Sequence, residues 1–376
     1  MVGFRNIFRY GRLQALDGSV ACSMLERRTC SPWLATLLAG ALCLSVWQMI
    51  GCPGPPSPMI LTSPVYTVLS FANASADTPY AMDQLKADDY SRLVNLHGFR
   101  FTMFSQACNE SGVPPPLLLV LVHSAPDNVA KRRTIRQTWG EPRDAMKLVF
   151  MVGQVATREA QLKLDQENRI HEDLVQGSFM DAYRNMTYKH VMALKYAVYH
   201  CPQAKYILKT DDDIFVNMPT MMTFLNVELS PWGARRLLLC RPLYNSVAKR
   251  SFRSKWRVSY SEYSHRNYPP YCPGWAILYS PDVVFKLYAE AQRTQYFWID
   301  DVLVTGILAE RAQLIHTPVA DFVLTPSAVE TLVKSNGTKG STGMFLYGPP
   351  DMVQDDIYAL WAVVQDRLKQ YRSLSP

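Results

Sequence analysis

The chain has 376 residues, of which 48% are hydrophobic and 19% are charged, and its formal net charge is +7. These values are ordinary for a globular protein, argue against an extreme composition class, and leave room for one large domain with accessory segments. The positive charges are scattered apart from one patch, KRSFRSKWR at residues 249–257, and no nucleic-acid-binding motif accompanies it. We therefore expect no nucleic-acid partner, and we interpret the patch as a solvated loop or as a contact for a small anion such as a diphosphate.

Near the N-terminus, SPWLATLLAGALCLSVWQMIG contains 18 consecutive residues, 33–50, without a charged side chain. A helix of that length extends roughly 27 Å, which is enough to cross a thin bilayer. A buried core helix is one alternative, and a cleaved signal peptide is another, although its apolar core is usually shorter and small residues mark its cleavage site. Trp47, Gln48 and Met49 stand at that place instead. We expect a signal-anchor transmembrane helix at residues 32–51.

Two features indicate the side of the membrane on which each part lies. Residues 1–31 hold five arginines against Asp17 and Glu26, so the positive-inside rule predicts a cytosolic tail and a lumenal remainder. The sequence thus predicts a single-pass type II membrane protein. Asn-X-Ser/Thr sequons for N-glycosylation all lie beyond the anchor, at Asn73, Asn109, Asn185 and Asn336.

Beyond the anchor, the residue composition and the hydrophobic pattern of the chain change near residue 113. Before that point, CPGPPSPMILTSP is rich in proline, which favours extended backbone, and we expect a Pro-rich stem at residues 52–112. After it, buried-strand and helix patterns alternate, which predicts an α/β domain with a mostly parallel sheet at residues 113–346. We expect residues 347–376 to form a partly helical C-terminal segment.

The strands and helices of this domain follow one another in a regular order. PPPLLLVLVHS, KLVFMVG and KYILKT are short apolar runs that suit strands buried on both faces. VAKRRTIRQTWG and TREAQLKLDQENRI read as helices, and TYKHVMALKYAVYH places Val191, Leu194 and Val198 on one helix face. Ligands of open α/β sheets bind beyond the carboxyl ends of the strands, and the KYILKT strand ends directly at three acids.

These three acids, residues 211–213, are called the acid run below. Two unit charges about 4 Å apart repel by roughly 4 kcal/mol at an effective dielectric near 20, so the run needs a counter-charge. Mn²⁺ or Mg²⁺ suits it, because both prefer carboxylate oxygens and leave positions open for water and diphosphate. Asp211 and Asp213 share one face of an extended backbone while Asp212 points elsewhere, so we expect Asp211 and Asp213 as metal ligands. An Asx-type turn with Lys209 as ion-pair partner is the alternative.

Six motifs in order make the region from about residue 115 to 309 resemble a known family, the β1,3-glycosyltransferases of the galactosyl- and N-acetylglucosaminyl-transferring group. AKRRTIRQTWG resembles the family's Arg-x-x-Ile-Arg-x-Thr-Trp segment, and FMDAYRNMTYKH its Asp-x-Tyr-x-Asn-Leu-Thr-x-Lys element. KTDDDIFVN is close to the family's metal motif, while SKWRVSYSEY and YPPYCPGW match its Lys-Trp and Tyr-Pro-x-Tyr-Cys-x-Gly signatures. IDDVLVTG falls where the family has Glu-Asp-Val-x-x-Gly.

The resemblance implies a Golgi type II enzyme with a GT-A fold, a Rossmann-like α/β arrangement, that uses Mn²⁺ (or Mg²⁺) and a UDP-sugar. It implies a β1,3 bond made with inversion, onto a glycan acceptor carried by protein or lipid. UDP-galactose is our first choice of donor, and a UDP-N-acetylhexosamine is the runner-up. A catalytically silent Golgi protein that binds glycans or partner transferases is a further alternative, and a homo- or hetero-oligomer with other transferases is compatible with all of these.

The resemblance also implies roles for single residues. Asp301 matches the catalytic base, and Asp300 replaces the family's Glu, although Asp at a helix start is also an ordinary cap. For the nucleotide sugar we expect Asp212, Arg132, Arg136, Lys209 and Lys255, with an exposed helix face as the alternative for the two arginines. For the acceptor pocket we expect Tyr271, Gly274 and Trp275, with core packing as the alternative for the aromatic residues. The implied disulfides join Cys108 to Cys201 and Cys240 to Cys272.

The chain departs from the family pattern at two places. MFLYGPPDMVQDD contains no histidine where the family usually supplies a further metal ligand, so Asp351, water or His316 would replace it, or the metal would bind more weakly. Trp275 occupies a stretch that is rich in glycine in the family, and we expect it to reshape the donor or acceptor pocket.

Overall fold

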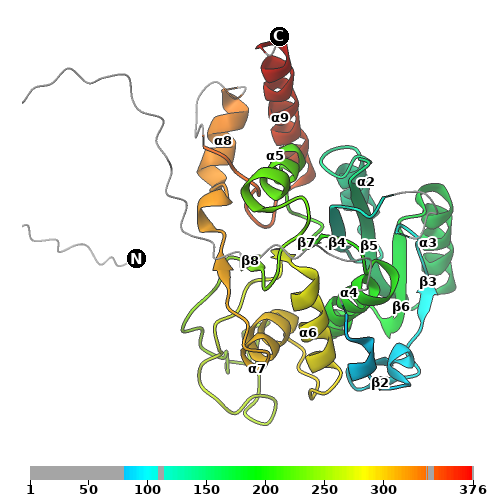
Figure 1. The fold of residues 1–376 in the computed structure, drawn as a ribbon. Helices are drawn as coiled ribbons and strands as arrows, with labels where there is room; N and C mark the ends of the chain where they lie inside the picture. The colour runs from blue at the N-terminus through cyan, green and yellow to red at the C-terminus, as the bar shows by residue number, and fades with distance from the viewer. Residues whose placement is uncertain (1–79, 109–113, 336, 338–342, 375–376) are drawn as a thin grey trace, which may run out of the picture. The chain divides into compact units, whose positions relative to one another are not determined.

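The structure, a computed structural model, describes residues 80–108, 114–335, 337 and 343–374 (Figure 1). The expected cytosolic tail, the expected membrane anchor at residues 32–51, and the sequons at Asn73, Asn109 and Asn336 lie outside the described residues. Among the helices that are described, none combines the length and the apolar character needed to cross a bilayer.

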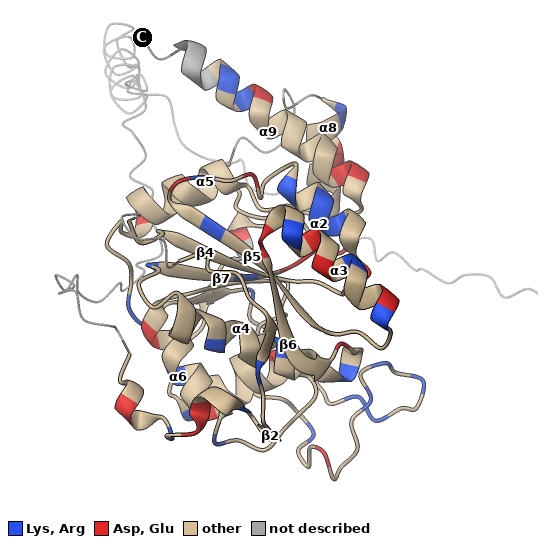
Figure 2. Cartoon of the chain, turned by 90° about the vertical axis from the view of Figure 1, so that its right-hand side faces the viewer, with Lys and Arg blue, Asp and Glu red and all other residues tan. Residues whose placement is uncertain are grey.

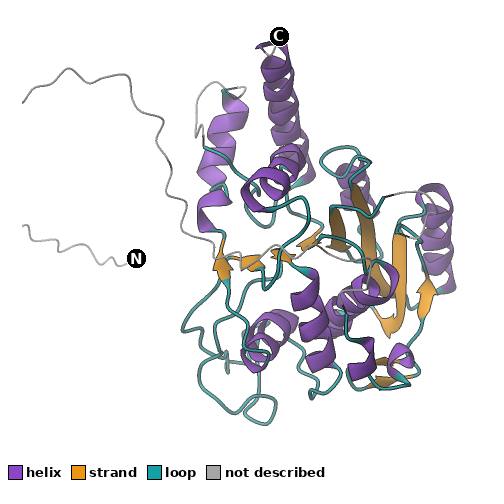
Figure 3. Ribbon diagram, viewed as in Figure 1, coloured by secondary structure: helices purple, strands orange, loops and turns teal. Residues whose placement is uncertain are grey.

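A mixed sheet of eight strands forms the middle layer of the described part (Figures 1 and 3). In order across the sheet, the strands are β10 (Thr317–Pro318), β8 (Leu238–Cys240), β9 (Ala276–Tyr279), β7 (Tyr206–Asp211), β4 (Leu118–His123), β5 (Met146–Gln154), β6 (Leu174–Met180) and β3 (Phe101–Met103). The four central strands β7, β4, β5 and β6 run parallel, whereas β9 and β3 run antiparallel to their neighbours. All six residues of β4 are buried, because helices cover both faces of this strand.

The helices lie in two layers, one on each face of the sheet (Figure 1). Side chains alternate between the faces, so Leu119 and Leu121 of β4 join one core while Leu118 and Val120 join the other. The first face, called the α4 face below, packs against α4 (Met186–His200), α6 (Pro281–Ala291), the π-helical η5 (Val302–Leu308) and α7 (Ala309–Arg311). The second, the α2 face, packs against α2 (Val129–Arg136), α3 (Arg158–His171), α5 (Met218–Thr223), η4 (Phe224–Leu229), α8 (Pro326–Lys334) and α9 (Gln354–Leu374).

Charge follows this layering. Figure 2 shows the strands largely tan, while the outer surfaces of α2 and α3 carry blue and red residues. Burial of largely apolar strands between helices with charged outer surfaces is the pattern expected for parallel strands. The remaining short elements are η1 (Met82–Gln84), η2 (Asp89–Ser91), β1 (Arg92–Leu93), β2 (Leu96–His97), η3 (Tyr183–Asn185) and η6 (Ala320–Phe322).

The α/β class with a parallel centre is confirmed, and the strands and helices expected from the sequence correspond to β4, β5, β7, α2, α3 and α4. The expected boundaries fit less well. Residues 80–108, assigned to the stem, contribute β3 to the sheet and Leu93 and Phe99 to the core of the α4 face. The C-terminal segment is helical as expected, but α9 packs into the core of the α2 face. Both segments therefore pack in the same unit as the described residues between 114 and 346.

Candidate active site

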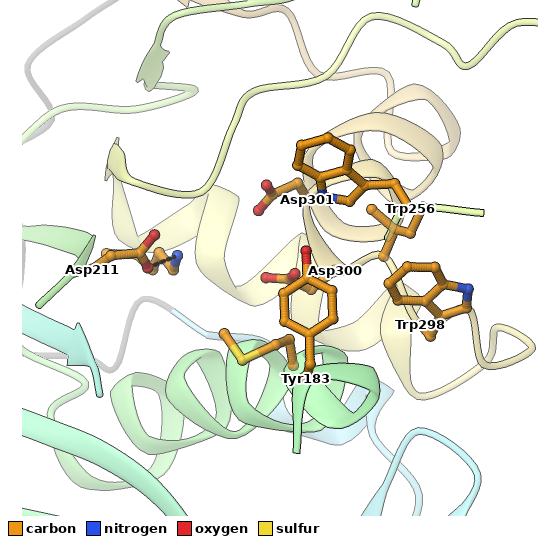
Figure 4. Close-up of a pocket in the computed structure, with 9 residues that line it drawn as sticks. Tyr183, Asp211, Trp256, Trp298, Asp300 and Asp301 are labelled. Atoms are coloured by element: carbon orange, nitrogen blue, oxygen red, sulfur yellow. Dashed lines mark hydrogen bonds and ion pairs between the residues drawn. The ribbon is translucent and has the colours of Figure 1, made fainter. Parts of the chain in front are cut away.

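A pocket of about 170 Å³ lies where β7 ends, against the first turn of the helix that continues as η5. Figure 4 shows Asp300 and Asp301 between Asp211 on one side and Trp256 and Trp298 on the other. Its position beyond the carboxyl ends of parallel strands is the one expected for a ligand site. The lining residues are Tyr183, Met186, Lys209, Asp211, Trp256, Trp298, Ile299, Asp300 and Asp301.

Asp211, the last residue of β7, is held by a lysine from the same strand. Lys209 Nζ donates to Asp211 Oδ1 at 2.7 Å and also to the carbonyl of Gly274. Burial raises the pKa of Asp211 to about 6, although the Lys209 charge opposes this rise. Burial alone lowers the pKa of Lys209, but the charges of Asp211, Asp300 and Asp301 outweigh it and the pKa ends above its ordinary value. Lys209 is therefore an ammonium ion that faces three carboxyl groups.

The second and third acids of the run share a different lysine. Asp212 Oδ2 accepts hydrogen bonds from Ser124 Oγ at 2.7 Å and from Asn128 Nδ2 at 2.8 Å. Lys131 Nζ lies 3.1 Å from Asp212 Oδ1 and 2.9 Å from Asp213 Oδ2. Asp211 and Asp213, expected to share one cation, thus contact separate lysines among the described residues, and their role as metal ligands stays a prediction.

Arg132, expected at the nucleotide sugar, is fully buried and binds protein groups instead. Its Nε and Nη2 donate to Glu167 at 2.8 and 2.6 Å, and its Nη1 donates to Ser124 Oγ at 2.9 Å. The carbonyls of residues 125 and 126 accept the other two N–H groups. With all five donors occupied, Arg132 holds the loop after β4, and through Ser124 it supports Asp212. The structure thus corrects the expected nucleotide contact to a structural one.

Arg136 needs the same correction. It donates to both carboxylate oxygens of Asp173 and to Glu167, each at 2.8 Å, and its guanidinium lies 4.7 Å from the centre of the Phe150 ring. These contacts tie α2 to the end of α3, where Glu167 and Asp173 lie on either side of the helix end. Lys255, by contrast, lies 4.4 Å from the centre of the Trp256 ring that lines the pocket, so its expected role is compatible with its place.

Asp300 and Asp301, called the acid pair below, open the helical turn that leads into η5. His190 Nδ1 lies 3.0 Å from Asp300 Oδ2, and His190 Nε2 lies 3.2 Å from the Tyr279 hydroxyl. The ligand atoms of His190, Asp300 and Asp301 lie within 4.8 Å of one another, so this group could hold a metal ion. Both ring nitrogens of His190 already have hydrogen-bond partners.

The two acids of the pair differ in their proton affinity. Burial raises the pKa of Asp301 well above its ordinary value, and the neighbouring Asp300 charge raises it further. Burial acts on Asp300 in the same direction, but the hydrogen bond from His190 and the charge of Lys209 outweigh it, and the pKa of Asp300 ends below its ordinary value. A pair of carboxyl groups with pKa values pushed apart is the arrangement found where one acid carries a proton in catalysis and the other stays charged.

Close backbone contacts fix Asp301 in place. A Cβ on Gly274 would lie 2.2 Å from Asp301 Oδ1 and 2.6 Å from Lys209 Nζ, so any larger residue here would displace these two charged groups. Thr305 Oγ1 donates to the carbonyl of Asp301 at 2.7 Å and accepts from the Cys272 N–H at 2.9 Å. The π-helical turn of η5 is thereby tied to the segment that precedes β9, and π-turns of this kind are frequent at functional sites.

The aromatic wall of the pocket comes from residues that the sequence analysis did not select. Trp275, expected there, is only 8% exposed and packs in the core of the α2 face, and Tyr271 packs at the edge of the α4 face core. The pocket is lined instead by Tyr183, Trp256 and Trp298. Each of these three stands inside or beside a quoted motif, DAYRN, SKW or FWIDD, which is the signal that could have found them. His190 and Lys131 were also missed, because their contacts depend on side-chain direction in three dimensions.

The two departures from the family pattern meet in space. The Trp275 ring lies 6.1 Å from the ring of Tyr347, edge to face, and Tyr347 belongs to the stretch without a histidine. The same stretch reaches the acid run, because the Met352 N–H donates to the carbonyl of Asp213 at 3.0 Å. The exposed Asp351 directly precedes this contact. His316, in contrast, has its Nε2 2.6 Å from the Thr305 carbonyl, so Asp351 is better placed to replace the missing ligand.

The covalent features fall as follows. The structure joins Cys108 to Cys201 and Cys240 to Cys272, the two pairings that the resemblance implied. At the described sequon, the Asn185 amide donates to the carbonyl of residue 180 at 2.8 Å, and Thr187 is fully buried. The folded chain therefore presents this sequon poorly to a modifying enzyme.

Comparison with known proteins agrees with the motifs. Residues 130–319, half of the chain, match the family model described as Galactosyltransferase. Beta-1,3-galactosyltransferase 5 of Gorilla gorilla gorilla is 35% identical over 204 residues, which cover 53% of this chain and 67% of that protein. UDP-GalNAc:beta-1,3-N-acetylgalactosaminyltransferase 1 of Rattus norvegicus is 33% identical over 229 residues, which cover 58% of this chain and 67% of that protein.

Among solved structures, the galactosyltransferase LgtC in complex with donor and acceptor sugar analogs aligns with 66% of this chain and 95% of its own. Its TM-score of 0.33 and 9% identity are too low to support an argument about this chain. The assignment rests on the family match and on the sequence relatives, and it confirms the family indicated by the six motifs. The chain belongs to the galactosyltransferase family and is a glycosyltransferase of the β1,3-linking group.

Proposed function

We propose that this chain transfers a hexose, with galactose the first choice, from a UDP-sugar to the 3-hydroxyl of an acceptor sugar, in β linkage and with inversion. The observation that carries the proposal is Asp301, a partly buried carboxyl of raised pKa that lines a pocket with an aromatic wall. A proton acceptor beside flat aromatic surface is what attack by a sugar hydroxyl requires. The names of the two relatives support a β1,3 linkage and a galactose-type donor.

In the proposed step, an Asp301 carboxylate oxygen accepts the proton of the acceptor 3-hydroxyl as the hydroxyl oxygen forms a bond to the anomeric carbon of the donor. The bond from that carbon to the diphosphate oxygen breaks, and UDP leaves with the electron pair. Attack opposite to the leaving group inverts the anomeric centre. Lys209, which faces the acid pair and Asp211, holds positive charge at the end of β7 where a diphosphate would approach.

The residues present fit a divalent cation. Five carboxyl groups, those of the acid run and the acid pair, face two ammonium groups, Lys131 and Lys209, in the described part of the site. An excess of negative charge at a partly exposed strand end suits Mn²⁺ or Mg²⁺. Asp213 and Asp211 would hold the ion, with Asp351 as the proposed replacement for the family's histidine. When bound, the ion would supply positive charge against the leaving UDP.

Two alternative functions are each supported by a specific observation. A β1,3-N-acetylhexosaminyltransferase is favoured by the relative named for N-acetylgalactosamine transfer. A catalytically silent glycan-binding or partner protein is favoured by the Trp275–Tyr347 contact, which joins both departures from the family pattern. We also propose a GT-A fold, a single-pass type II position in the Golgi membrane with a lumenal catalytic domain, and a glycan acceptor on protein or lipid.

A donor panel tests the proposal. The purified full chain in detergent is incubated with Mn²⁺ and, in turn, UDP-galactose, UDP-N-acetylgalactosamine and UDP-N-acetylglucosamine, with and without a panel of acceptor glycans, and released UDP is measured. We expect acceptor-dependent release that is fastest with UDP-galactose and that stops when EDTA removes the metal. Fastest release from an N-acetylhexosamine donor would replace the first choice by the runner-up. UDP binding without release from any donor would support the silent alternative.

A further inference from the structure

We propose that His190 is a positioning residue that, with Tyr279 behind it, keeps Asp300 ionised beside Asp301, so that Asp301 alone accepts the proton of the acceptor hydroxyl. This inference rests on the proposed function, and it deepens the assignment of the acid pair. Three segments far apart in the chain supply the parts: His190 from α4, Tyr279 from β9 and Asp300 from the turn before η5. The chain Tyr279–His190–Asp300 is called the relay below.

The hydrogen bonds of the relay have one consistent direction. Tyr279 is fully buried, and burial raises the pKa of its hydroxyl well above the ordinary value, so the hydroxyl keeps its proton and donates. An ionised Asp300 can only accept, so the single proton of a neutral ring lies on Nδ1, and Nε2, 3.2 Å from the Tyr279 hydroxyl, accepts from that hydroxyl. Nδ1 lies 3.0 Å from Asp300 Oδ2 and donates to it. A neutral ring is the expected form, because burial lowers the pKa of His190 against the opposing charge of Asp300.

The relay reaches only one acid of the pair. Asp300 receives the imidazole N–H, while Asp301 faces Gly274 and Lys209 on the other side. A hydrogen bond to a carboxylate stabilises its charged form, and a fixed negative charge next to Asp301 makes the ionisation of Asp301 harder. As a consequence, the two acids differ in protonation: Asp300 stays charged, and Asp301 has the higher proton affinity. Higher proton affinity is what a general base needs near neutral pH.

The other titratable groups around the relay are compatible with a charged Asp300 and an Asp301 of higher proton affinity. His123 of β4 has its ring 5.4 Å from the His190 ring, and neither of its nitrogens has a hydrogen-bond partner among the described residues. Its pKa is lowered by burial and by the nearby Lys209, so it adds no positive charge at neutral pH. The groups that face the relay from neighbouring elements are His123, Lys209, Asp211, Tyr183, Tyr296 and Asp301.

A metal ion held by His190, Asp300 and Asp301 is the competing interpretation. It would require Nδ1 or Nε2 of His190 to lose its proton or its acceptor contact and to turn a lone pair toward the ion. The side chain of His190 is 0% exposed, and both nitrogens are bonded in the relay, so the hydrogen-bonded form accounts for every polar atom of the ring. The relay also needs no group beyond the chain itself.

The first test measures the protonation state of the His190 ring directly and needs no substrate. The full chain is labelled with ¹⁵N-histidine, and two-bond proton–nitrogen correlation spectra are recorded between pH 5.5 and 8, with the His190 signals assigned by their loss in His190→Asn. The chain has 7 histidines, so the spectra stay simple. We expect a neutral ring protonated at Nδ1 over the whole range. An Nε2-protonated ring, a charged ring, or a ring signal that changes when EDTA is added would overturn the relay.

The second test separates positioning from structural support. His190→Leu removes the donor, whereas His190→Asn keeps an N–H at the place of Nδ1. With UDP-galactose, Mn²⁺ and an acceptor, we expect Leu to lower kcat by about 10- to 100-fold with donor KM changed less than about threefold. The acidic limb of the kcat–pH profile should move to lower pH, because Asp300 without its donor ionises less readily, and the weaker negative charge beside Asp301 lets Asp301 ionise at lower pH. Asn should restore most of the rate and the position of the limb.

The outcomes distinguish the two proposals. Equal losses in the Leu and Asn variants, with matching falls in melting temperature and an unmoved pH profile, would show a structural role only and overturn the relay's part in transfer. If the unmodified chain releases UDP from no donor, the proposed function fails, while the spectra still decide whether the relay exists.

Discussion

The acid run and the acid pair both consist of aspartates, but the two groups differ in the hydrogen-bond donors and cations that contact their carboxylates. In the run every carboxylate has a cation or a donor: Asp211 has Lys209, and Asp212 and Asp213 share Lys131. In the pair, Asp300 takes the histidine, and Asp301 has a backbone contact from Gly274 and the more distant charge of Lys209. The run is therefore arranged to meet positive charge, and the pair is arranged to hold one proton.

This difference shows why a count of carboxylates does not reveal their chemistry. Burial acts on Asp211, Asp300 and Asp301 in the same direction, toward the neutral form. The partner decides the result, because a donor to one carboxylate stabilises its charge, and that charge then disfavours the charge of its neighbour.

The largest effect is expected when the proton acceptor of the pair is removed. Asp301→Asn keeps the shape of the side chain but cannot accept the proton, so kcat should fall by about 100- to 10,000-fold. Binding of UDP with Mn²⁺ should change little, because we propose that the run, and not the pair, holds the ion. Transfer kinetics and UDP calorimetry measure the two quantities, and Asp355→Asn on the exposed face of α9 is the matched control. Unchanged kcat in Asp301→Asn would show that another group is the base.

The end of strand β7 and the acid run could be predicted because their positions depend only on neighbouring residues in the sequence. An apolar run such as KYILKT must be buried, and acids directly behind it must lie at the carboxyl edge of the sheet. The acid pair was likewise found through a short motif, IDDVLVTG. What these motifs could not give is the identity of the partner, since Lys131 and His190 come from helices that precede the acids by many residues.

Residues within motifs were also assigned to the wrong neighbour in several cases. Arg132 and Arg136 lie on the helix behind the first predicted strand, where a diphosphate was expected, but Glu167 of α3 reaches both of them. Trp275 precedes β9, and its ring turns to the α2 face, away from the pocket. Side-chain direction at a strand end depends on which helices cover each face, and the sequence pattern does not specify that.

A smaller effect is expected from a substitution that does not touch the acid run directly but removes a residue that supports it. Arg132→Met removes one of the two arginine partners of the buried Glu167 and leaves only Arg136, so the free energy of unfolding should fall by about 3 kcal/mol. Ser124 loses its donor as well, and Asp212 loses part of its support. Chemical denaturation gives the stability, and the exposed Arg133→Met on the same helix is the control, with an expected change below about 0.5 kcal/mol. Equal losses in the two variants would contradict the structural role of Arg132.

The smallest expected effect is a pH-dependent stabilisation of the run by metal. The pKa of Asp211 is about 6 in the folded chain against an ordinary value of 3.8, so between these values the folded state binds a proton that the unfolded state has lost. Stability without metal therefore falls as pH rises through this window. Mn²⁺ needs the ionised carboxylate, so it should raise the melting temperature by about 5 °C at pH 7.5 and clearly less at pH 5.

Thermal melts with Mn²⁺ or with EDTA at the two pH values measure this difference. Asp213→Asn should abolish it, because the second proposed ligand is lost, whereas Asp301→Asn should keep it. An Mn²⁺ effect that is equal at pH 5 and pH 7.5, or that disappears in Asp301→Asn but persists in Asp213→Asn, would assign the ion to the acid pair. In that case His190 and Asp300 would be its other ligands, and the division between a run that binds a cation and a pair that holds a proton would be reversed.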